Sequence, residues 1–282
     1  MRVLVFGAGG AQGGAVARRL VEEGLAVRGV SRTGAVPEGV EPVRADLGDR
    51  GRLREAFAGV TRVSMVLPLE YDPGRVAAYT RNVLAEAAAA GVARLVFNPS
   101  NRLPRADTGA AAFDTRRAAA RAVLDSPVPA VVLCPPIYLE NLAAPWVRRG
   151  LACEGVLRYP VPASVPVAWL SHADLAAATL AALTGDDLAG ATLDLGGEPM
   201  TGPELAAAFG ARYEAVDVEV FAAGMAAALG PDVAAGVAGT YRWVAGPGRE
   251  LYAASPGGAK RLGIEVTSPA DWAAGQAWRW QR

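Results

Sequence analysis

The N-terminal segment VLVFGAGGAQGG, residues 3–14, is the most informative part of this 282-residue chain. Its first four residues are apolar and predict a buried strand, and the segment AVARRLV (15–21) that follows predicts a helix. The glycines between them let a backbone approach a ligand closely, and the unpaired N–H groups of a first helical turn attract an anion. The stretch therefore predicts a strand–turn–helix unit that binds a dinucleotide, rather than a tight turn without a ligand. The predicted cofactor contacts in this unit are Gly7, Gly9, Gly10, Ala11, Gln12 and Gly13.

Strand-like and helix-like segments alternate through the rest of the first half of the chain. Repeated strand–helix units joined by short loops predict an α/β fold of the Rossmann type, a doubly wound parallel sheet with helices on both faces. In such sheets the ligand lies at the carboxyl ends of the strands, so the segments after each strand should form one rim. The expected strands are 27–31, 62–67, 94–97 and 130–133, and the expected helices are 53–57, 76–90 and 110–124.

The second half of the chain is less regular. Residues 138–166 and 200–282 do not fit simple strand–helix units, and we expect them to form a small C-terminal lobe over the rim, where a substrate would bind. Residues 1–282 would then be a single NAD(P)-binding domain that carries this substrate-binding lobe. Helices are expected at 174–183, 205–209, 222–229 and 233–237, with one late strand at 192–195.

Composition excludes several classes of protein. Lys+Arg and Asp+Glu both number 28, so the formal net charge is zero and gives no reason to expect nucleic acid or an anionic membrane as a partner. No apolar run is long enough to cross a bilayer, and we expect no signal peptide because the first residues already read as a strand. Cys134 and Cys153 fit neither a metal site nor a disulfide framework. We therefore expect a cytoplasmic protein, a monomer or homodimer, that binds a small molecule and no metal.

The residues at the end of the strand expected at 27–31 indicate whether the cofactor is NADPH or NADH. A carboxylate there would bind a free ribose 2′-hydroxyl, whereas Arg32 is placed to pair with a 2′-phosphate. NADPH is therefore the predicted cofactor, with NADH as the alternative if Arg32 is a solvated surface residue. Asp46, in the segment before the helix expected at 53–57, either accepts a hydrogen bond from the adenine amino group or caps a helix. The other expected cofactor contacts along the rim are Leu47, Leu67, Pro68, Asn98, Pro99 and Pro135.

Several segments together resemble the short-chain dehydrogenase/reductase superfamily, and especially its atypical NmrA-like branch. They are the glycine-rich turn, Arg32, Asp46-Leu47, the segment CPPIYLEN (134–141) and the segment VAWLSHADLA (167–176). The resemblance covers most of residues 1–200. It implies a single-domain NAD(P)-binding fold with a substrate lobe near the C-terminus.

Standard members of this superfamily carry a Ser, a Tyr about thirteen residues later and a Lys four residues after the Tyr. The Tyr hydroxyl protonates the carbonyl oxygen as hydride arrives, and the Lys lowers the pKa of that Tyr. Counting from Ser100 places Phe113 and Arg117 at these two positions. Phe113 has no proton to give, and Arg117 can contact ribose hydroxyls but does not transfer a proton. Lys260, the one lysine of the sequence, lies far along the chain.

The proton for a carbonyl reduction must then come from another group. Tyr138 and Tyr71 follow strand ends on the rim, and His172, the one imidazole, is able to titrate near neutral pH. Each also has an ordinary structural explanation, as a cavity wall or a helix cap, and a phenol of the substrate could supply the proton itself. The predicted catalytic residues are Ser100, Tyr138 and Arg117. The predicted substrate contacts are Tyr71, Asn101, Phe113, Tyr138, Trp146, Tyr159 and His172.

These observations favour an NADPH-dependent ketoreductase without a Tyr/Lys general acid. Aromatic residues outside the cofactor half predict a pocket for a bulky, aromatic polycyclic ketone of the kind tailored in antibiotic pathways. The expected lobe carries no charge cluster, which argues against phosphorylated substrates. Two alternatives stay open: a non-catalytic NADP-binding redox sensor, and a quinone or ene reductase, whose acceptor needs less help from a protein acid. The aromatic residues near the C-terminus that support this expectation are Trp243, Trp272, Trp278 and Trp280.

Overall fold

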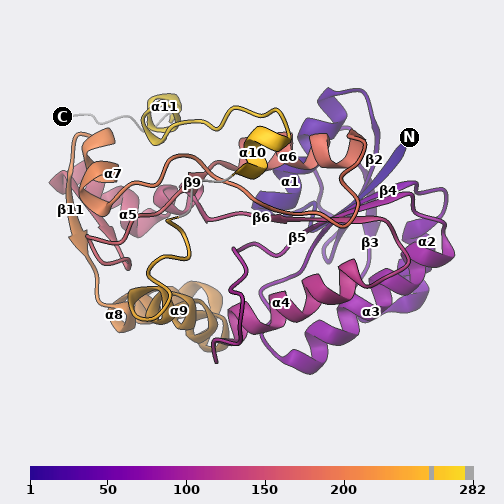
Figure 1. The fold of residues 1–282 in the computed structure, drawn as a ribbon, viewed down its shortest axis with the longest axis horizontal. Helices are drawn as coiled ribbons and strands as arrows, with labels where there is room; N and C mark the ends of the chain where they lie inside the picture. Colours follow the sequence, from indigo (N-terminus) through magenta and orange to yellow (C-terminus); the bar gives the residue numbers. More distant parts are fainter. Residues whose placement is uncertain (254–256, 277–282) are drawn as a thin grey trace.

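The computed structural model describes residues 1–253 and 257–276, so Trp278 and Trp280 lie outside the described residues. Its centre is a seven-stranded sheet in the order β10-β6-β5-β4-β1-β2-β3, in which neighbouring strands are parallel (Figure 1). The strand order reverses between β1 and β4, which creates a crevice at their carboxyl ends, and the predicted doubly wound fold is confirmed. The strands are β1 (Arg2–Phe6), β2 (Ala26–Ser31), β3 (Glu41–Arg44), β4 (Arg62–Val66), β5 (Arg94–Asn98), β6 (Ala130–Cys134) and β10 (Thr192–Asp194).

β1 is an interior strand of the sheet, and its side chains are apolar on both faces. Val3, Leu4 and Val5 are fully buried, and Phe6 is nearly so. The strand pairs with β2 on one side and with β4 on the other. A strand covered on both faces needs a continuous apolar run instead of an alternating one. Residues 3–6 therefore mark an interior strand.

Helices cover both faces of the sheet. α1 (Ala11–Glu22) and α6 (His172–Thr184) pack against each other on one face (Figure 1). α2 (Arg50–Phe57), α3 (Pro73–Ala89) and α4 (Ala111–Leu124) lie side by side on the other face. Each face has its own apolar core, with Leu20 and Leu175 in one and Val83 and Val123 in the other.

Side-chain caps determine where several of these helices begin. The Asp72 carboxylate accepts the N–H of Arg75 at 2.7 Å and starts α3. The Ser171 hydroxyl accepts the N–H of Asp174 at 2.9 Å, and the Asp174 carboxylate accepts the N–H of Ser171. α6 therefore begins at His172, two residues before the start that the apolar pattern predicts.

The remaining elements lie mostly beyond the carboxyl ends of the central strands (Figure 1). Here β8 pairs with β11 and β7 pairs with β9, and a third apolar core joins α5, α7 and α9. No helix within the described ranges has both the length and the apolar character of a bilayer span. These elements are β7 (Ile137–Tyr138), η1 (Leu139–Ala143), α5 (Pro145–Arg149), η2 (Gly150–Glu154), β8 (Val156–Tyr159), β9 (Trp169–Leu170), α7 (Gly202–Ala208), β11 (Arg212–Ala215), α8 (Val218–Leu229), α9 (Pro231–Ala245), α10 (Gly257–Arg261) and α11 (Pro269–Gly275).

Candidate active site

The glycine-rich turn between β1 and α1 is built so tightly that side chains would not fit. Gly7 has φ +66°, a conformation that L residues rarely adopt, and its carbonyl accepts the N–H of Gly10 at 2.8 Å. A Cβ on Gly13 would collide with the carbonyl oxygen of Gly7, and a Cβ on Gly9 would lie 2.5 Å from the carbonyl oxygen of Ala35. The glycines therefore let α1 approach the end of β1 and leave the turn open to a ligand.

The N-terminus of α1 has the features of an anion site. Its N-cap is Gly10, which has no side chain to bond the helical N–H groups, and its first turn has no acidic residue. Ser31, at the end of β2, lies against Gly9, and its buried Oγ has no hydrogen-bond partner among the described residues. An unpaired buried hydroxyl beside uncapped N–H groups fits the ribose and phosphates of a dinucleotide.

Two arginines lie at the carboxyl ends of β2 and β3. Arg32 and Arg44 are both exposed, and Arg44 Nε donates to the carbonyl oxygen of Arg32 at 3.1 Å. Neither side chain has an ion pair within residues 1–253 and 257–276. The Asp46 carboxylate closes a turn by accepting the N–H of Gly48 at 2.8 Å. The sequence indicates Arg32 by its position at the end of β2 but gives no signal for Arg44, whose proximity to Arg32 depends on the register of β2 and β3.

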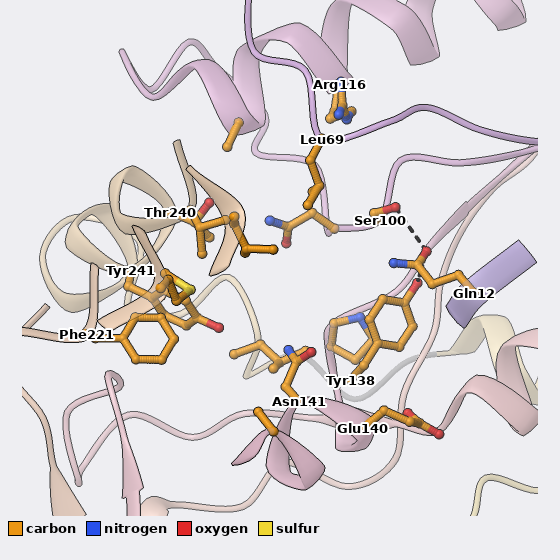
Figure 2. Close-up of a pocket in the computed structure, with 18 of the residues that line it drawn as sticks. Gln12, Leu69, Ser100, Arg116, Tyr138, Glu140, Asn141, Phe221, Thr240 and Tyr241 are labelled. Carbon is orange, nitrogen blue, oxygen red and sulfur yellow. Dashed lines mark hydrogen bonds between the residues drawn. The ribbon is translucent and has the colours of Figure 1, made fainter. Parts of the chain in front are cut away.

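A cavity of about 380 Å³ opens at the same edge of the sheet (Figure 2). Residues from α1, from the loops after β4 and β5, from α4, and from the elements after β6 surround it. Its volume lies within the range of small-molecule sites in proteins. The predicted residues that line it are Gln12, Leu67, Tyr71, Pro99, Ser100, Asn101, Tyr138, Trp146 and Tyr159.

Gln12 is the central polar residue of the cavity wall. Its Oε1 accepts hydrogen bonds from Asn98 Nδ2 at 2.8 Å, from the Ser100 hydroxyl at 3.0 Å and from the Tyr138 hydroxyl at 3.2 Å. Figure 2 shows the amide nitrogen of Gln12 turned toward the cavity, and Nε2 has no acceptor in the part of the chain that the structure describes. Three predicted residues thus meet at one amide oxygen.

The backbone N–H of Ser100 fixes the orientation of the side-chain amides of Asn98 and Gln12. The N–H of Ser100 donates to Asn98 Oδ1 at 2.7 Å, which leaves Nδ2 of Asn98 to face Gln12. Since Nδ2 can only donate, it meets Oε1 of Gln12, and the Nε2 of Gln12 must point the other way. Ser100 itself has φ +60°, an unusual conformation for a residue other than glycine. Such strained positions cluster at functional sites.

Tyr138 is a weak acid in this position. Burial raises the pKa of its hydroxyl above the ordinary value, and the hydrogen bond from Asn98 only partly opposes this. The one lysine of the sequence, Lys260, lies on α10 and does not line the cavity. Tyr138 is therefore better suited to hold Gln12 than to release a proton near neutral pH.

The register of α4 differs from the one obtained by counting from Ser100. Ala112 and Arg116 line the cavity, whereas Phe113 is fully buried and packs edge-on against Trp243, with ring centroids 5.0 Å apart. Arg117 faces away from the cavity and pairs with Asp107. Phe113 and Arg117, which occupy the expected Tyr and Lys positions, thus do not line the cavity. Their neighbours Ala112 and Arg116 line it instead.

His172 and Pro135 also lie outside the cavity wall. The His172 ring packs edge-on behind Tyr138, with centroids 4.7 Å apart, and its Nδ1 lies 3.8 Å from Glu140 Oε2. Burial, with a smaller contribution from Arg18, lowers the pKa of His172 to about 4, so the imidazole is neutral near pH 7. Pro136 lines the cavity in place of its neighbour Pro135.

Aromatic side chains form the end of the cavity farthest from Gln12 in Figure 2. The hydroxyls of Tyr159 and Tyr241 are 2.6 Å apart, and Phe221 packs against both rings. Burial raises the pKa of Tyr159 to about 12, so this pair is neutral. The α8 and α9 residues were missed by sequence reasoning because no motif marks them and only the tertiary fold brings them to the rim. They are Phe221, Met225, Leu229, Val237, Thr240 and Tyr241.

The described part of the chain contains no cluster of His, Cys, Asp and Glu side chains that could hold a metal ion. Residues 1–225 match the NmrA-like family, and the chain belongs to that family.

Among characterised proteins, the chain is similar to (4-alkanoyl-5-oxo-2,5-dihydrofuran-3-yl)methyl phosphate reductase of Streptomyces griseus subsp. griseus. The two are 38% identical over 190 residues, which are 65% of this chain and 63% of the relative. The match thus spans less than two thirds of that relative's length.

Solved structures with the same fold are more distant in sequence. An NADPH-dependent quinone oxidoreductase of Escherichia coli, complexed with NADPH, has a TM-score of 0.76 at 22% identity, over 97% of this chain and 99% of that one. Triphenylmethane reductase of Citrobacter sp., complexed with NADP(H), has a TM-score of 0.78 at 19% identity, over 96% and 99% of the two chains. A nucleoside-diphosphate-sugar epimerase of Staphylococcus aureus has a TM-score of 0.81 at 20% identity, over 97% and 99%. These likenesses establish the fold.

Proposed function

We propose that this protein is an NADPH-dependent reductase that transfers hydride to a carbonyl compound bound in the cavity, without a Tyr/Lys general acid. One observation carries the proposal: Gln12 belongs both to the first turn of α1 and to the cavity wall. A dinucleotide held by its pyrophosphate at that helix end therefore has the cavity beside it. The elements after β6 that complete the cavity would form the substrate lobe.

NADPH is the proposed cofactor because of the charge at the ends of β2 and β3. Arg32 and Arg44 would face the 2′-phosphate, while Ser31 and the N-terminus of α1 would hold the ribose and the pyrophosphate. When bound, the nicotinamide supplies the hydride. The names of the Escherichia coli quinone oxidoreductase and the Citrobacter reductase, both complexed with this cofactor, support the choice.

The role proposed for Gln12 follows from its fixed orientation. Hydride addition to a carbonyl carbon pushes the electron pair of the C=O bond onto the oxygen. The Nε2 of Gln12, held toward the cavity by Asn98, Ser100 and Tyr138, would donate a hydrogen bond to that oxygen. A donor that is already oriented stabilises developing negative charge without reorganisation.

The proton is proposed to come from water at the cavity mouth or from a hydroxyl of the substrate itself. The cavity face of α4, where the Tyr general acid of the superfamily is expected, carries Ala112. Burial raises the pKa of Tyr71 and of Tyr138. The second candidate, a quinone or ene reductase, is favoured by the same observation. A conjugated acceptor delocalises the negative charge and needs less help from a protein acid.

The cavity supports a compact acceptor over the polycyclic ketone expected from the sequence. A protein cavity of about 150 Å³ accommodates one benzene ring. A volume of about 380 Å³ would have to hold both a nicotinamide and the reacting part of the acceptor. The Streptomyces griseus relative, by its name, reduces a single-ring compound with alkanoyl and oxo groups, which supports this choice. A non-catalytic redox sensor has no need for such a cavity.

The test is NADPH oxidation with a small quinone and with an aromatic ketone as acceptors. Gln12→Leu should bind NADPH within a few-fold of the wild type but lower kcat about 100-fold, the typical loss of one preorganised oxyanion donor. Tyr138→Phe is the matched control, because Asn98 and Ser100 still hold the Gln12 amide, and it should lose less than tenfold. Normal turnover by Gln12→Leu would remove Gln12 from the mechanism. NADPH binding without turnover of these acceptors, or of counterparts that carry a carboxylate or a phosphate, would favour the sensor.

A further inference from the structure

Arg116 is a buried cation in the cavity wall. It lies on α4, is 4% exposed, and its Nη2 donates to the carbonyl oxygen of Pro68 at 2.5 Å. Its Nη1 is shielded from solvent and has no hydrogen-bond partner among residues 1–253 and 257–276. A guanidinium stays charged in proteins, so an unpaired buried one is an unfavourable arrangement unless a ligand completes it.

The acidic neighbour of Arg116 is already used by other groups. Glu70 accepts the N–H groups of Tyr71 and Asp72, each at 3.0 Å, and pairs with Arg75 at 3.1 Å. The Tyr71 ring lies 6.0 Å from the Arg116 guanidinium and provides a weak cation–π contact, but no negative charge. Burial accordingly lowers the pKa of Arg116 from its ordinary value.

Another buried arginine of the chain is satisfied by the protein. Arg28, which is 8% exposed, pairs with Glu41 at 2.9 Å and donates to the carbonyl oxygens of Ala56 and Ala58 at 2.9 and 3.0 Å. Arg116 has one carbonyl in place of these three acceptors. Arg116 therefore has fewer hydrogen-bond acceptors than Arg28, and it lies in the wall of the cavity.

We propose that Arg116 binds an oxyanion of the acceptor, a carboxylate or a phosphate monoester, and so defines the substrate as an anionic carbonyl compound. The inference rests on the proposed function. Figure 2 shows the three regions that such a molecule would meet: Arg116 on one side, Gln12 on another, and the aromatic end with Phe221 and Tyr241. The anion anchors one end, the carbonyl faces Gln12, and the apolar part lies against the aromatic rings.

Phosphorylated acceptors are thereby proposed, although the lack of a charge cluster in the C-terminal lobe argues against them. That argument considers charge in the C-terminal lobe, whereas Arg116 is supplied by α4, from the first half of the chain. The burial of Arg116 strengthens the interaction, because an ion pair out of water is screened less than an exposed one. A charge-assisted hydrogen bond from the guanidinium also helps to orient the bound molecule.

Phenyl phosphate and phenol are the matched probes, titrated calorimetrically into protein saturated with NADP⁺. The cofactor occupies the N-terminus of α1 and the arginines at β2 and β3, which removes those sites from the measurement. The wild type should bind phenyl phosphate at least tenfold more tightly than phenol. Arg116→Met should abolish that preference, and Arg116→Lys should retain part of it. Arg117→Met, the adjacent arginine paired with Asp107, should keep the full preference.

Three results would overturn the inference. The first is a wild type that binds phenol as well as phenyl phosphate. The second is an equal loss of preference in Arg116→Met and Arg117→Met. The third is weaker NADP⁺ binding by Arg116→Met and Arg116→Lys with an unchanged preference for phenyl phosphate, which would assign Arg116 to the cofactor. Failure of the wild type to bind NADP⁺ would instead contradict the proposed function, and it is measured separately.

Discussion

Arg32 and Arg44 carry the charge that should decide between NADPH and NADH. Replacing either with Gln removes one charge-assisted hydrogen bond to a 2′-phosphate, worth about 1.5 to 3 kcal/mol, or roughly 10- to 150-fold in affinity. We expect this loss for NADPH and a change of less than threefold for NADH, which lacks the phosphate. Fluorescence titration with both cofactors measures the two constants.

Arg52 supplies the control for these two substitutions. It borders the same surface groove as Arg32 and Arg44, but its side chain pairs with Glu55 at 2.8 Å. Arg52→Gln should therefore leave both cofactor affinities unchanged. If Arg32→Gln and Arg44→Gln weaken NADPH and NADH equally, these side chains do not contact the 2′-phosphate.

The cavity residues at the strand ends could be predicted from the sequence for a physical reason. Gln12, Ser100 and Tyr138 follow three different strands or turns, and a parallel sheet brings its carboxyl ends to one edge. What the sequence did not contain was the hydrogen bonding among them. That arrangement depends on the left-handed conformation of Ser100, and nothing in a serine predicts a positive φ.

At the scale of the element, α4 illustrates what a sequence leaves undetermined. The helix was predicted over 110–124 and observed at Ala111–Leu124. Its rotation was not predicted, because one residue of error turns a helix by about 100° and moves a side chain from the cavity into the core. The count from Ser100 passes through an irregular loop before α4, and such a loop carries no periodicity by which to determine that rotation.

The contact between α2 and α3 depends on one buried carboxylate. Glu86, 3% exposed, accepts bonds from Arg50 at 2.9 Å and Arg54 at 3.3 Å. Burial alone would raise the pKa of Glu86, but the bonds from these arginines outweigh it and the pKa is lowered. A lowered pKa means that this stabilisation is present above the pKa of the unfolded chain and is lost as the pH falls through the folded value.

Glu86→Gln should therefore destabilise the protein by about 1 to 2 kcal/mol near pH 7, since both arginines are largely exposed and partly screened. Urea unfolding at several pH values should show the difference from wild type shrinking below a pH of about 4.3, the ordinary Glu value. Glu55→Gln, in an exposed pair, should leave stability unchanged. Equal losses for both variants would contradict this role for Glu86.

At the scale of the whole molecule, the second half of the chain is built into the first. β10 extends the central sheet by pairing with β6, and α6 packs against α1. Tyr252 donates to Asn101, and Arg102 donates to the carbonyl oxygens of Leu195 and Leu251. The central sheet was predictable because each strand is a local apolar run. The elements after β6 were not, since their order in space depends on contacts between distant segments.

This interlocking predicts one cooperative unfolding transition for the described fold. The six tryptophans all follow residue 145, so their fluorescence reports on the second half of the chain, whereas far-UV circular dichroism reports on every helix. The two denaturation curves should coincide, as they do when no intermediate is populated. NADP⁺ at 100 times its Kd should stabilise the fold by about 2.7 kcal/mol and raise Tm by roughly 5 to 10 °C for both probes. A fluorescence transition that precedes the loss of helix, or that fails to move with NADP⁺, would instead indicate a second half that unfolds independently of the cofactor site.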